Sequence, residues 1–383
     1  MFKRPRDLHN KNIYVYCLIF GGSTLLTGVG IFAKDWPLFL AYIPFLSLFF
    51  THKNGIKASV LAGHFIWPFI IGIWGLLNLE YNLILTLVCS AASLFILIYV
   101  ILKIGLVATS LILLALPFFP VNPLMIVGSL SPGLGLWGVF IASIILFTLE
   151  RMKSNRLKAL SFVFLLSGAF VLNQHNTDKI ENQTLQAQTK QDYITIKTSD
   201  IVALSQIGQF DQTLKLMKPS STIVLGENMF EHSDIAAKHY WCEAVKNNHF
   251  TAYIGVEGKD GTGEIWLFSR ETCPSPKVIY RAEVGIPTLT GDWIPNSETK
   301  IFNRNIQSTT SWLLCYEGFS FFRWLEVGLK SPKTILILSN DKITSPLPTG
   351  ILREKLGREF AKLFNLNVFH ANTGLRFLKK SKL

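Results

Sequence analysis

The sequence predicts a protein of two parts, an N-terminal multi-span α-helical membrane bundle and a C-terminal α/β domain. Of its 383 residues, 49% are hydrophobic and only 16% are charged, whereas about a quarter of an ordinary soluble domain is charged. The apolar excess lies before residue 175, and most charges lie after it. After residue 192, short β-branched runs alternate with segments of helical spacing, which is typical of a layered α/β domain.

The N-terminal part is predicted to cross the membrane about seven times, because one span needs about 20 apolar residues. Tryptophans near the ends of the apolar runs, such as Trp36 and Trp74, suit the membrane interface. The second and sixth runs are short, which leaves the number of spans open between about six and eight. The predicted spans are 13–33, 36–50, 58–78, 81–102, 104–128, 135–149 and 158–174.

Lys and Arg gather in alternate loops of this predicted bundle. The intervening loops, AKDW, NLEYN and GSLSPGLG, carry a single Lys among them. With seven spans every basic segment falls on one side of the membrane, and basic loops stay in the cytoplasm. We therefore expect the chain after residue 175 to lie outside the bacterial inner membrane, in the periplasm, and we expect no nucleic-acid partner despite the net charge of +12. The basic segments are 3–11, 53–57, Lys103 and 151–158.

The predicted domains are a transmembrane domain over 1–175, a polar connector over 176–192 and an α/β domain over 193–383. The five cysteines include no CxxC pair and no zinc spacing, so we expect neither a metal nor a cofactor. Cys242 and Cys273 are candidates for a disulfide if the α/β domain faces an oxidising compartment.

The α/β domain is predicted to contain six strands or strand-and-turn segments before its end, interleaved with two helices. The helices are expected over 232–248 and 353–365, where the apolar residues recur at helical spacing. The expected strands are 193–199, 221–228, 251–258, 264–271, 308–319 and 332–341, followed by a last strand and turn over 366–374.

Polar residues cluster directly after three of these strands. Glu227 follows IVLG, Cys315 and Glu317 follow WLL, and Asn340 with Asp341 follows ILILS. Layered α/β sheets place their sites at the carboxyl ends of strands. A carboxylate that takes a thiol proton there allows the thiolate to attack a carbonyl. The alternative is that Cys315 fills the core and that the polar residues belong to solvated turns; residue spacing leaves both interpretations open.

Four segments of this half resemble the nitrilase (carbon–nitrogen hydrolase) superfamily: IVLGEN, LLCYEGF, ILSND and HANTG. Together with the membrane layout, they are similar to apolipoprotein N-acyltransferase, which joins a multi-span bundle to a periplasmic nitrilase-like domain. The resemblance implies an α-β-β-α sandwich with a Glu, Lys and Cys triad. It implies Glu227 as general base and Cys315 as nucleophile. Supporting or substrate-binding roles then fall to Tyr316, Glu317 and Asn340.

The sequence departs from that family in two places. The stretch YRAEVGIPTLTGDWIP, over 280–295, matches the family's Lys segment, but the Lys position falls on Ala282. Arg281 beside it is expected to supply the positive charge, and Asp292 stands where the family has a supporting Glu. The chain ends soon after HANTG, which predicts a domain shortened at its C-terminus. Shortened relatives of this kind resemble the conjugal-transfer TraB proteins.

The expected function is that of a membrane-anchored thiol amidase or N-acyltransferase that forms an acyl-thioester on Cys315. Its substrate would be a membrane lipid, a lipoprotein or a pilin-like protein, in conjugal transfer or envelope protein modification. The alternative is a catalytically degenerate nitrilase-like scaffold that assembles a conjugation or secretion apparatus. A transporter is disfavoured, because the predicted spans carry almost no ionisable residue beyond His64.

Overall fold

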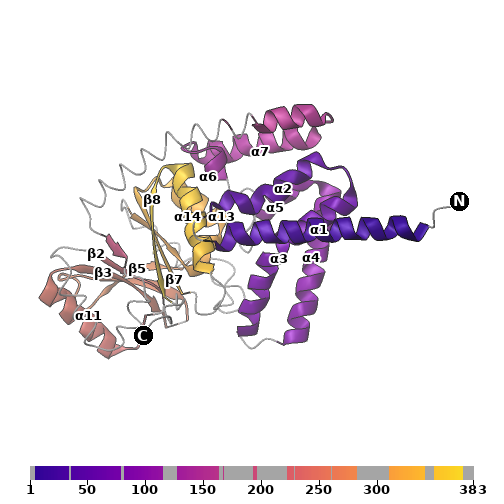
Figure 1. The fold of residues 1–383 in the computed structure, drawn as a ribbon. Helices are drawn as coiled ribbons and strands as arrows, with labels where there is room; N and C mark the ends of the chain where they lie inside the picture. Colours follow the sequence, from indigo (N-terminus) through magenta and orange to yellow (C-terminus); the bar gives the residue numbers. More distant parts are fainter. Residues whose placement is uncertain are drawn as a thin grey trace, which may run out of the picture. The chain divides into compact units, whose positions relative to one another are not determined.

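The structure, a computed structural model, divides the chain into two compact units (Figure 1). The first unit contains Met1–His175 and Ile351–Phe364, and the second contains Asn176–Gly350 and Asn365–Leu383. The described residues are 5–33, 36–78, 82–114, 127–163, 167, 193–195, 222–227, 229–259, 261–282, 310–340 and 349–373.

The N-terminal part of the first unit is helical, as its apolar runs predict. Residues 155–163 are also helical, beyond the last of the elements bounded below. The elements are α1 (Pro5–Phe32), η1 (Leu38–Tyr42), α2 (Ile43–Ser47), η2 (Leu48–Phe50), α3 (Asn54–Asn78), α4 (Leu83–Ile104), α5 (Leu106–Leu114), α6 (Val127–Leu130) and α7 (Gly135–Arg151).

Two of the described helices are long and apolar enough to cross a membrane. They are α1, over the 20 residues Ile13–Phe32, and α4, over the 22 residues Leu83–Ile104. At about 1.5 Å per residue, each reaches the roughly 30 Å of a hydrocarbon core. Large apolar side chains stand exposed along both, among them Leu18 and Phe95. A stretch of shorter apolar helix covers Leu38–Phe50, so seven spans remain a prediction.

Helix α14 (Thr349–Phe364) is the amphipathic helix predicted near the C-terminus, and its residues from 351 onward group with the first unit. Lys355 Nζ donates to the carbonyls of Gly30 and Ala33, at 2.6 and 2.7 Å, and so caps the C-terminal end of α1. Gly128 in α6 lies so close that a Cβ there would stand 1.8 Å from the Glu359 carbonyl oxygen. This close approach requires a residue without a side chain at position 128.

The second unit is a mixed α/β structure built on two sheets, which confirms the α/β character predicted after residue 192. In the five-stranded sheet, of order β1-β2-β3-β4-β5, the first three strands run parallel and the last three antiparallel. The other sheet is parallel, of order β6-β7-β8. The strands are β1 (Tyr193–Thr195), β2 (Thr222–Leu225), β3 (Thr251–Glu257), β4 (Gly263–Phe268), β5 (Lys277–Arg281), β6 (Thr310–Leu314), β7 (Thr334–Asn340) and β8 (Asn367–Thr373).

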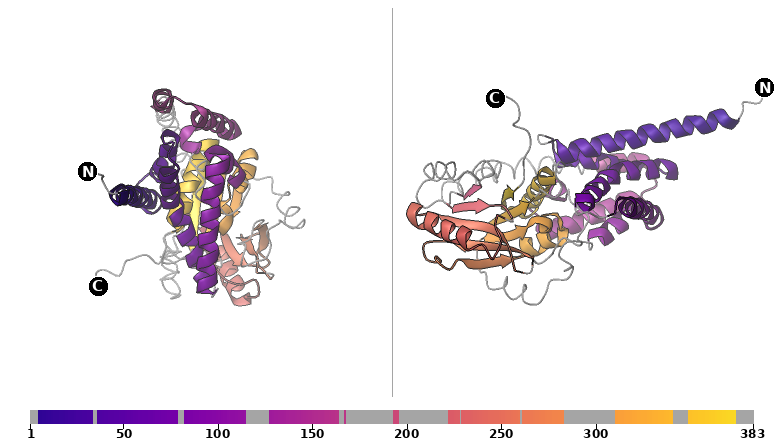
Figure 2. Two further views of the ribbon diagram at one scale, coloured as in Figure 1. Left: turned by 90° about the vertical axis from the view of Figure 1, so that its right-hand side faces the viewer. Right: turned by 90° about the horizontal axis from the view of Figure 1, so that it is seen from below.

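The two sheets pack face to face through one apolar cluster. Val224, Ile265 and Tyr280 from the first sheet meet Leu314 and Leu336 from the second. The opposite face of the first sheet is covered by α11 (Ile235–Asn248), which lies along it in the right-hand view of Figure 2. Alternate residues of each strand therefore belong to different layers.

A disulfide joins Cys242 of α11 to Cys273, which follows β4. Their Cα atoms lie 5.4 Å apart. This is the pair that the sequence offers as a candidate. The bridge therefore links α11 covalently to the turn between β4 and β5.

Candidate functional site

The carboxyl ends of β2, β6 and β7 meet at one place in the second unit. The Glu227 backbone N–H, just after β2, donates to the Ser339 carbonyl on β7 at 3.2 Å. A Cβ added to Gly263 would stand 2.9 Å from Glu227 Oε1 and 3.3 Å from Leu314 Cδ1. Glu227 therefore lies beside the last residue of β6 and beside the residue that precedes Asn340. The structure brings together the strand ends that the sequence singles out.

Cys315 begins a short 3-10 helix, η4 (Cys315–Phe319), directly after β6. Its φ of 37° lies in the left-handed region, which costs a residue with a side chain about 1–2 kcal/mol. Of the described non-glycine residues, three others share this feature, and each follows the end of a helix, where left-handed residues are common. Cys315 instead follows a strand, so its conformation is maintained by the surroundings of the turn. The other three residues are His249, Ser331 and Asn365.

Glu317 is fully buried and holds this turn closed. Its Oε2 accepts a hydrogen bond from the Leu314 backbone N–H at 2.8 Å and another from the Tyr280 hydroxyl at 2.9 Å. Arg323, on α13 (Phe321–Leu329), places its Nε 3.5 Å from Glu317 Oε1 and donates from Nη2 to the Tyr280 hydroxyl at 2.8 Å. Glu317 is thus a structural carboxylate of the turn, engaged by partners on three sides.

Arg281 is the last residue of β5 and forms an ion pair with the neighbouring strand β4. Its Nε lies 2.9 Å from Oε1 of the buried Glu264, its register partner on β4. Tyr280 and Ala282 belong to the cluster between the sheets. Glu264 also accepts a hydrogen bond from Nε1 of Trp266, a member of the α11-side cluster, so Arg281 points to the α11 face. Arg281 is thus paired with Glu264, and Arg323 is a cation that contacts Glu317 beneath the Cys315 turn.

The remaining expected site residues have mixed placements. Asn340 is the last residue of β7, and Tyr316 follows Cys315 in η4. Burial raises the pKa of the Tyr316 phenol above its ordinary value, so the group stays neutral. Asp292 and Asp341 lie outside the described residues.

Two further residues of the site were missed by sequence reasoning. Arg323 is the one basic residue in the apolar segment FFRWLEVGL of α13, and a single cation among apolar residues at helical spacing was the available signal. His370 lies on β8 with Nε2 2.8 Å from the Ser339 hydroxyl oxygen. It stands in the HANTG segment that the sequence singles out as a turn.

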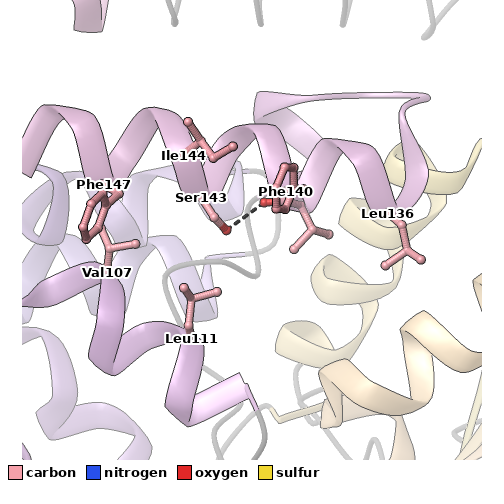
Figure 3. Close-up of a pocket in the computed structure, with 8 residues that line it drawn as sticks. Val107, Leu111, Leu136, Phe140, Ser143, Ile144 and Phe147 are labelled. Carbon is pink, nitrogen blue, oxygen red and sulfur yellow. Dashed lines mark hydrogen bonds between the residues drawn. The ribbon is translucent and has the colours of Figure 1, made fainter.

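A separate apolar pocket of 390 Å³ lies in the first unit between α5 and α7 (Figure 3). Its one polar lining residue, Ser143, donates its hydroxyl to the Val139 carbonyl within its own helix at 2.7 Å. None of the lining side chains is titratable, so this pocket supplies no acid–base chemistry. The lining residues are Val107, Leu111, Leu136, Val139, Phe140, Ser143, Ile144 and Phe147.

The described residues contain no group of three or more His, Cys, Asp or Glu side chains arranged to hold a metal ion. The strand-end cluster instead places Cys315 and Glu227 at neighbouring strand ends, and a thiol with a carboxylate base is one arrangement used in covalent thiol catalysis. Neither a protein-family model nor a curated protein matches this chain.

Proposed function

We propose that the protein is a membrane-anchored thiol amidase or N-acyltransferase whose nitrilase-like domain forms an acyl-thioester on Cys315. The observation that carries this proposal is the left-handed conformation of Cys315 at the end of β6, where the ends of β2 and β7 also lie. Strained residues of this kind concentrate at functional sites. Two facing sheets with a helix on the outer face, together with the four motifs, support the nitrilase-like sandwich.

The proposed reaction runs through a thioester. Glu227 takes the proton from the Cys315 thiol, and the thiolate attacks the carbonyl carbon of an ester or amide. The tetrahedral adduct expels the alcohol or amine, which leaves with the proton from Glu227. An amine or water then attacks the thioester and gives its proton to Glu227, which returns it to the departing Cys315 sulfur, so that the free thiol and the ionised Glu227 are restored. The proposed acyl donor or acceptor is a membrane lipid, a lipoprotein or a pilin-like protein.

The contacts within the first unit support a domain outside the inner membrane. Lys158 Nζ donates to the Phe49 carbonyl at 2.8 Å, and Glu150 Oε1 accepts from the Leu106 N–H at 2.7 Å. These contacts gather the segments near the basic loops at one end of the helices. Basic loops are cytoplasmic, which assigns that end to the cytoplasm.

Helix α14 contacts residues in or beside two of the three charge-poor loops. Besides the bonds from Lys355 near the AKDW loop, the Gly133 N–H in GSLSPGLG donates to the Lys362 carbonyl at 2.9 Å. These contacts, which lie within the first unit, favour a periplasmic position for α14, and the proposal places an odd number of spans, about seven, before the α/β domain. The Cys242–Cys273 disulfide also suits an oxidising compartment.

The second candidate is a catalytically degenerate scaffold that assembles a conjugation or secretion apparatus. One observation favours it: Ala282 stands at the family's Lys position, and the neighbouring Arg281 is paired with Glu264. A reaction that passes through an oxyanion loses about 10²–10³ in rate when a preorganised stabiliser is removed. The scaffold would keep the fold and bind its partner without turnover.

A trapped thioester distinguishes the two candidates. Membranes that contain the full chain would be isolated, and the peptide that carries Cys315 examined by mass spectrometry before and after neutral hydroxylamine. We expect an acyl adduct that hydroxylamine removes, and we expect Cys315→Ala to lack it while Cys89→Ala keeps it. A chain without the adduct, whose Cys315→Ala variant still supports conjugation or envelope assembly, would be a scaffold.

A further inference from the structure

Three buried polar side chains from three elements meet beneath the Cys315 turn. Tyr280 comes from β5, Glu317 from η4 and Arg323 from α13. Glu317 is 0% exposed, and the other two are 4% exposed. The Tyr280 hydroxyl donates to Glu317 Oε2 at 2.9 Å and accepts from Arg323 Nη2 at 2.8 Å, so it links the two charges. The same Oε2 holds the N–H of Leu314, the residue before Cys315.

A carboxylate at this depth needs a counter-charge, because removing an ion from water costs several kcal/mol. Arg323 supplies that charge with its Nε 3.5 Å from Glu317 Oε1. It also pairs with Glu326 at the outer side of α13. Burial alone would raise the pKa of the Glu326 carboxyl, but Arg323 and Lys330 hold that pKa below its ordinary value. Arg323 therefore acts on two carboxylates, one beneath the turn and one near the surface.

The position of Glu317, two residues after Cys315, makes this pairing chemically important. An uncompensated negative charge beside a thiol disfavours the thiolate. Protonation of Glu317 would cancel that charge, but it would weaken the acceptor that holds the Leu314 N–H. Only an ionised Glu317 whose charge is offset by a cation both holds the turn and leaves the thiolate accessible.

We infer that Arg323, acting through Tyr280 and Glu317, is the positioning residue that holds Cys315 in its reactive conformation and offsets the carboxylate beneath it. This inference rests on the proposed thiol chemistry and names a residue on which that chemistry depends. Arg323 itself does not touch the substrate. Its influence reaches Cys315 through the Leu314 N–H and through charge.

The described elements around the turn carry several other titratable groups, and a pH profile of the thiol would report on them together. The carboxylate of Glu227, after β2, lies beside Leu314, the residue that precedes Cys315. The variants tested below keep all of these other titratable groups. A difference between the pH profiles of wild type and variant therefore reports on Tyr280, Glu317 and Arg323. The other titratable groups are Glu227 after β2, Tyr316 in η4, Glu326 and Lys330 at the end of α13, and His370 on β8.

The test measures the rate at which iodoacetamide alkylates Cys315 as a function of pH, in the full chain in detergent. Arg323→Met should move the midpoint of this profile to higher pH, and below the midpoint each rise of about one pH unit lowers the alkylation rate about tenfold. Glu317→Gln combined with Arg323→Met removes both charges and should return the midpoint toward that of the wild type. Arg323→Lys should retain part of the effect, because it keeps the charge without the planar fork.

Matched controls separate this role from simple stabilisation. Arg358→Met removes an exposed pair with Glu354 and should leave the profile unchanged. If Arg323→Met does not fold, Tyr280→Phe removes only the linking hydroxyl and should slow alkylation several-fold. Folded Arg323→Met or Tyr280→Phe with the wild-type profile would overturn the inference. A profile moved to higher pH without any thioester would support the network while refuting the proposed acyl transfer, and a wild-type Cys315 that resists alkylation until unfolded would overturn both.

Discussion

At the residue scale, the backbone of Cys315 predicts an unusual order of stabilities among its variants. With φ at 37°, this position favours glycine, which adopts the left-handed region without steric cost. Cys315→Gly should therefore be more stable than Cys315→Ala by about 1 kcal/mol, although glycine normally destabilises a folded chain. Thermal unfolding of the two purified variants measures the difference. An alanine variant of equal or higher stability would show that the turn is not strained.

Gly263 offers a second test at the same scale, because its missing side chain leaves room for Glu227. A Cβ there would meet Glu227 Oε1 at 2.9 Å and Leu314 Cδ1 at 3.3 Å. Gly263→Ala should displace the Glu227 carboxylate and slow alkylation of Cys315, by up to about the 10²–10⁴-fold that a general base typically contributes. Gly22→Ala, which meets nothing within 4 Å, is the control. Wild-type reactivity in folded Gly263→Ala would remove Glu227 from the mechanism.

The expected positions of Glu227 and Cys315 follow from a local rule, since each comes directly after a buried strand. The network beneath Cys315 follows from no such rule. Tyr280 and Arg323 are 43 residues apart in the chain and become neighbours only when β5 and α13 are packed. Sequence spacing predicts a residue's element, but not which side chains of other elements it will touch.

At the element scale, the pairing of β5 with β4 determines which face of the sheet each side chain of β5 occupies. Arg281 lies on the α11 face with Glu264, where Trp266 Nε1 also donates to Glu264 at 2.7 Å. Arg281 thus pairs with Glu264, whereas its neighbours Tyr280 and Ala282 pack in the cluster between the sheets. The sequence alone does not show which face of the sheet each side chain of β5 occupies, because both faces of β5 are partly apolar.

This placement predicts that Arg281 affects stability rather than reactivity. Arg281→Met should reduce the free energy of unfolding by about 1–3 kcal/mol, because it removes a partner of a buried carboxylate. The alkylation rate of Cys315 should stay at the wild-type value. Chemical unfolding and the alkylation assay on one preparation measure both. A large loss of reactivity with unchanged stability would return Arg281 to the site.

At the scale of the whole molecule, the described contacts of the first unit join loops of like charge character. Lys158 and Glu150 contact segments near the basic loops, whereas α14 contacts residues in or beside two of the three charge-poor loops. The apolar runs predicted the helices α1, α3, α4 and α7 within a few residues at most ends. The number of spans was less predictable, because short apolar runs such as Leu38–Phe50 break into short helical pieces.

The proposed orientation makes a direct prediction for reporter fusions. Alkaline phosphatase fused after residue 190 should be active, because it would reach the oxidising periplasm. A cytoplasmic reporter at the same point should be silent. Fusions after Lys57 should show the opposite pattern and serve as the control. The reverse result at both points would place the α/β domain in the cytoplasm.

The order in which cysteines react in the native protein tests the nucleophile most directly. The full chain in detergent would receive a limiting amount of thiol reagent, and labelling of each cysteine would be compared after digestion. Cys315 should label fastest among the cysteines outside the disulfide, although it is more buried than Cys17 and Cys89. Glu227→Gln should slow it. Labelling of Cys315 only after unfolding, with normal function of Cys315→Ala in cells, would contradict the account.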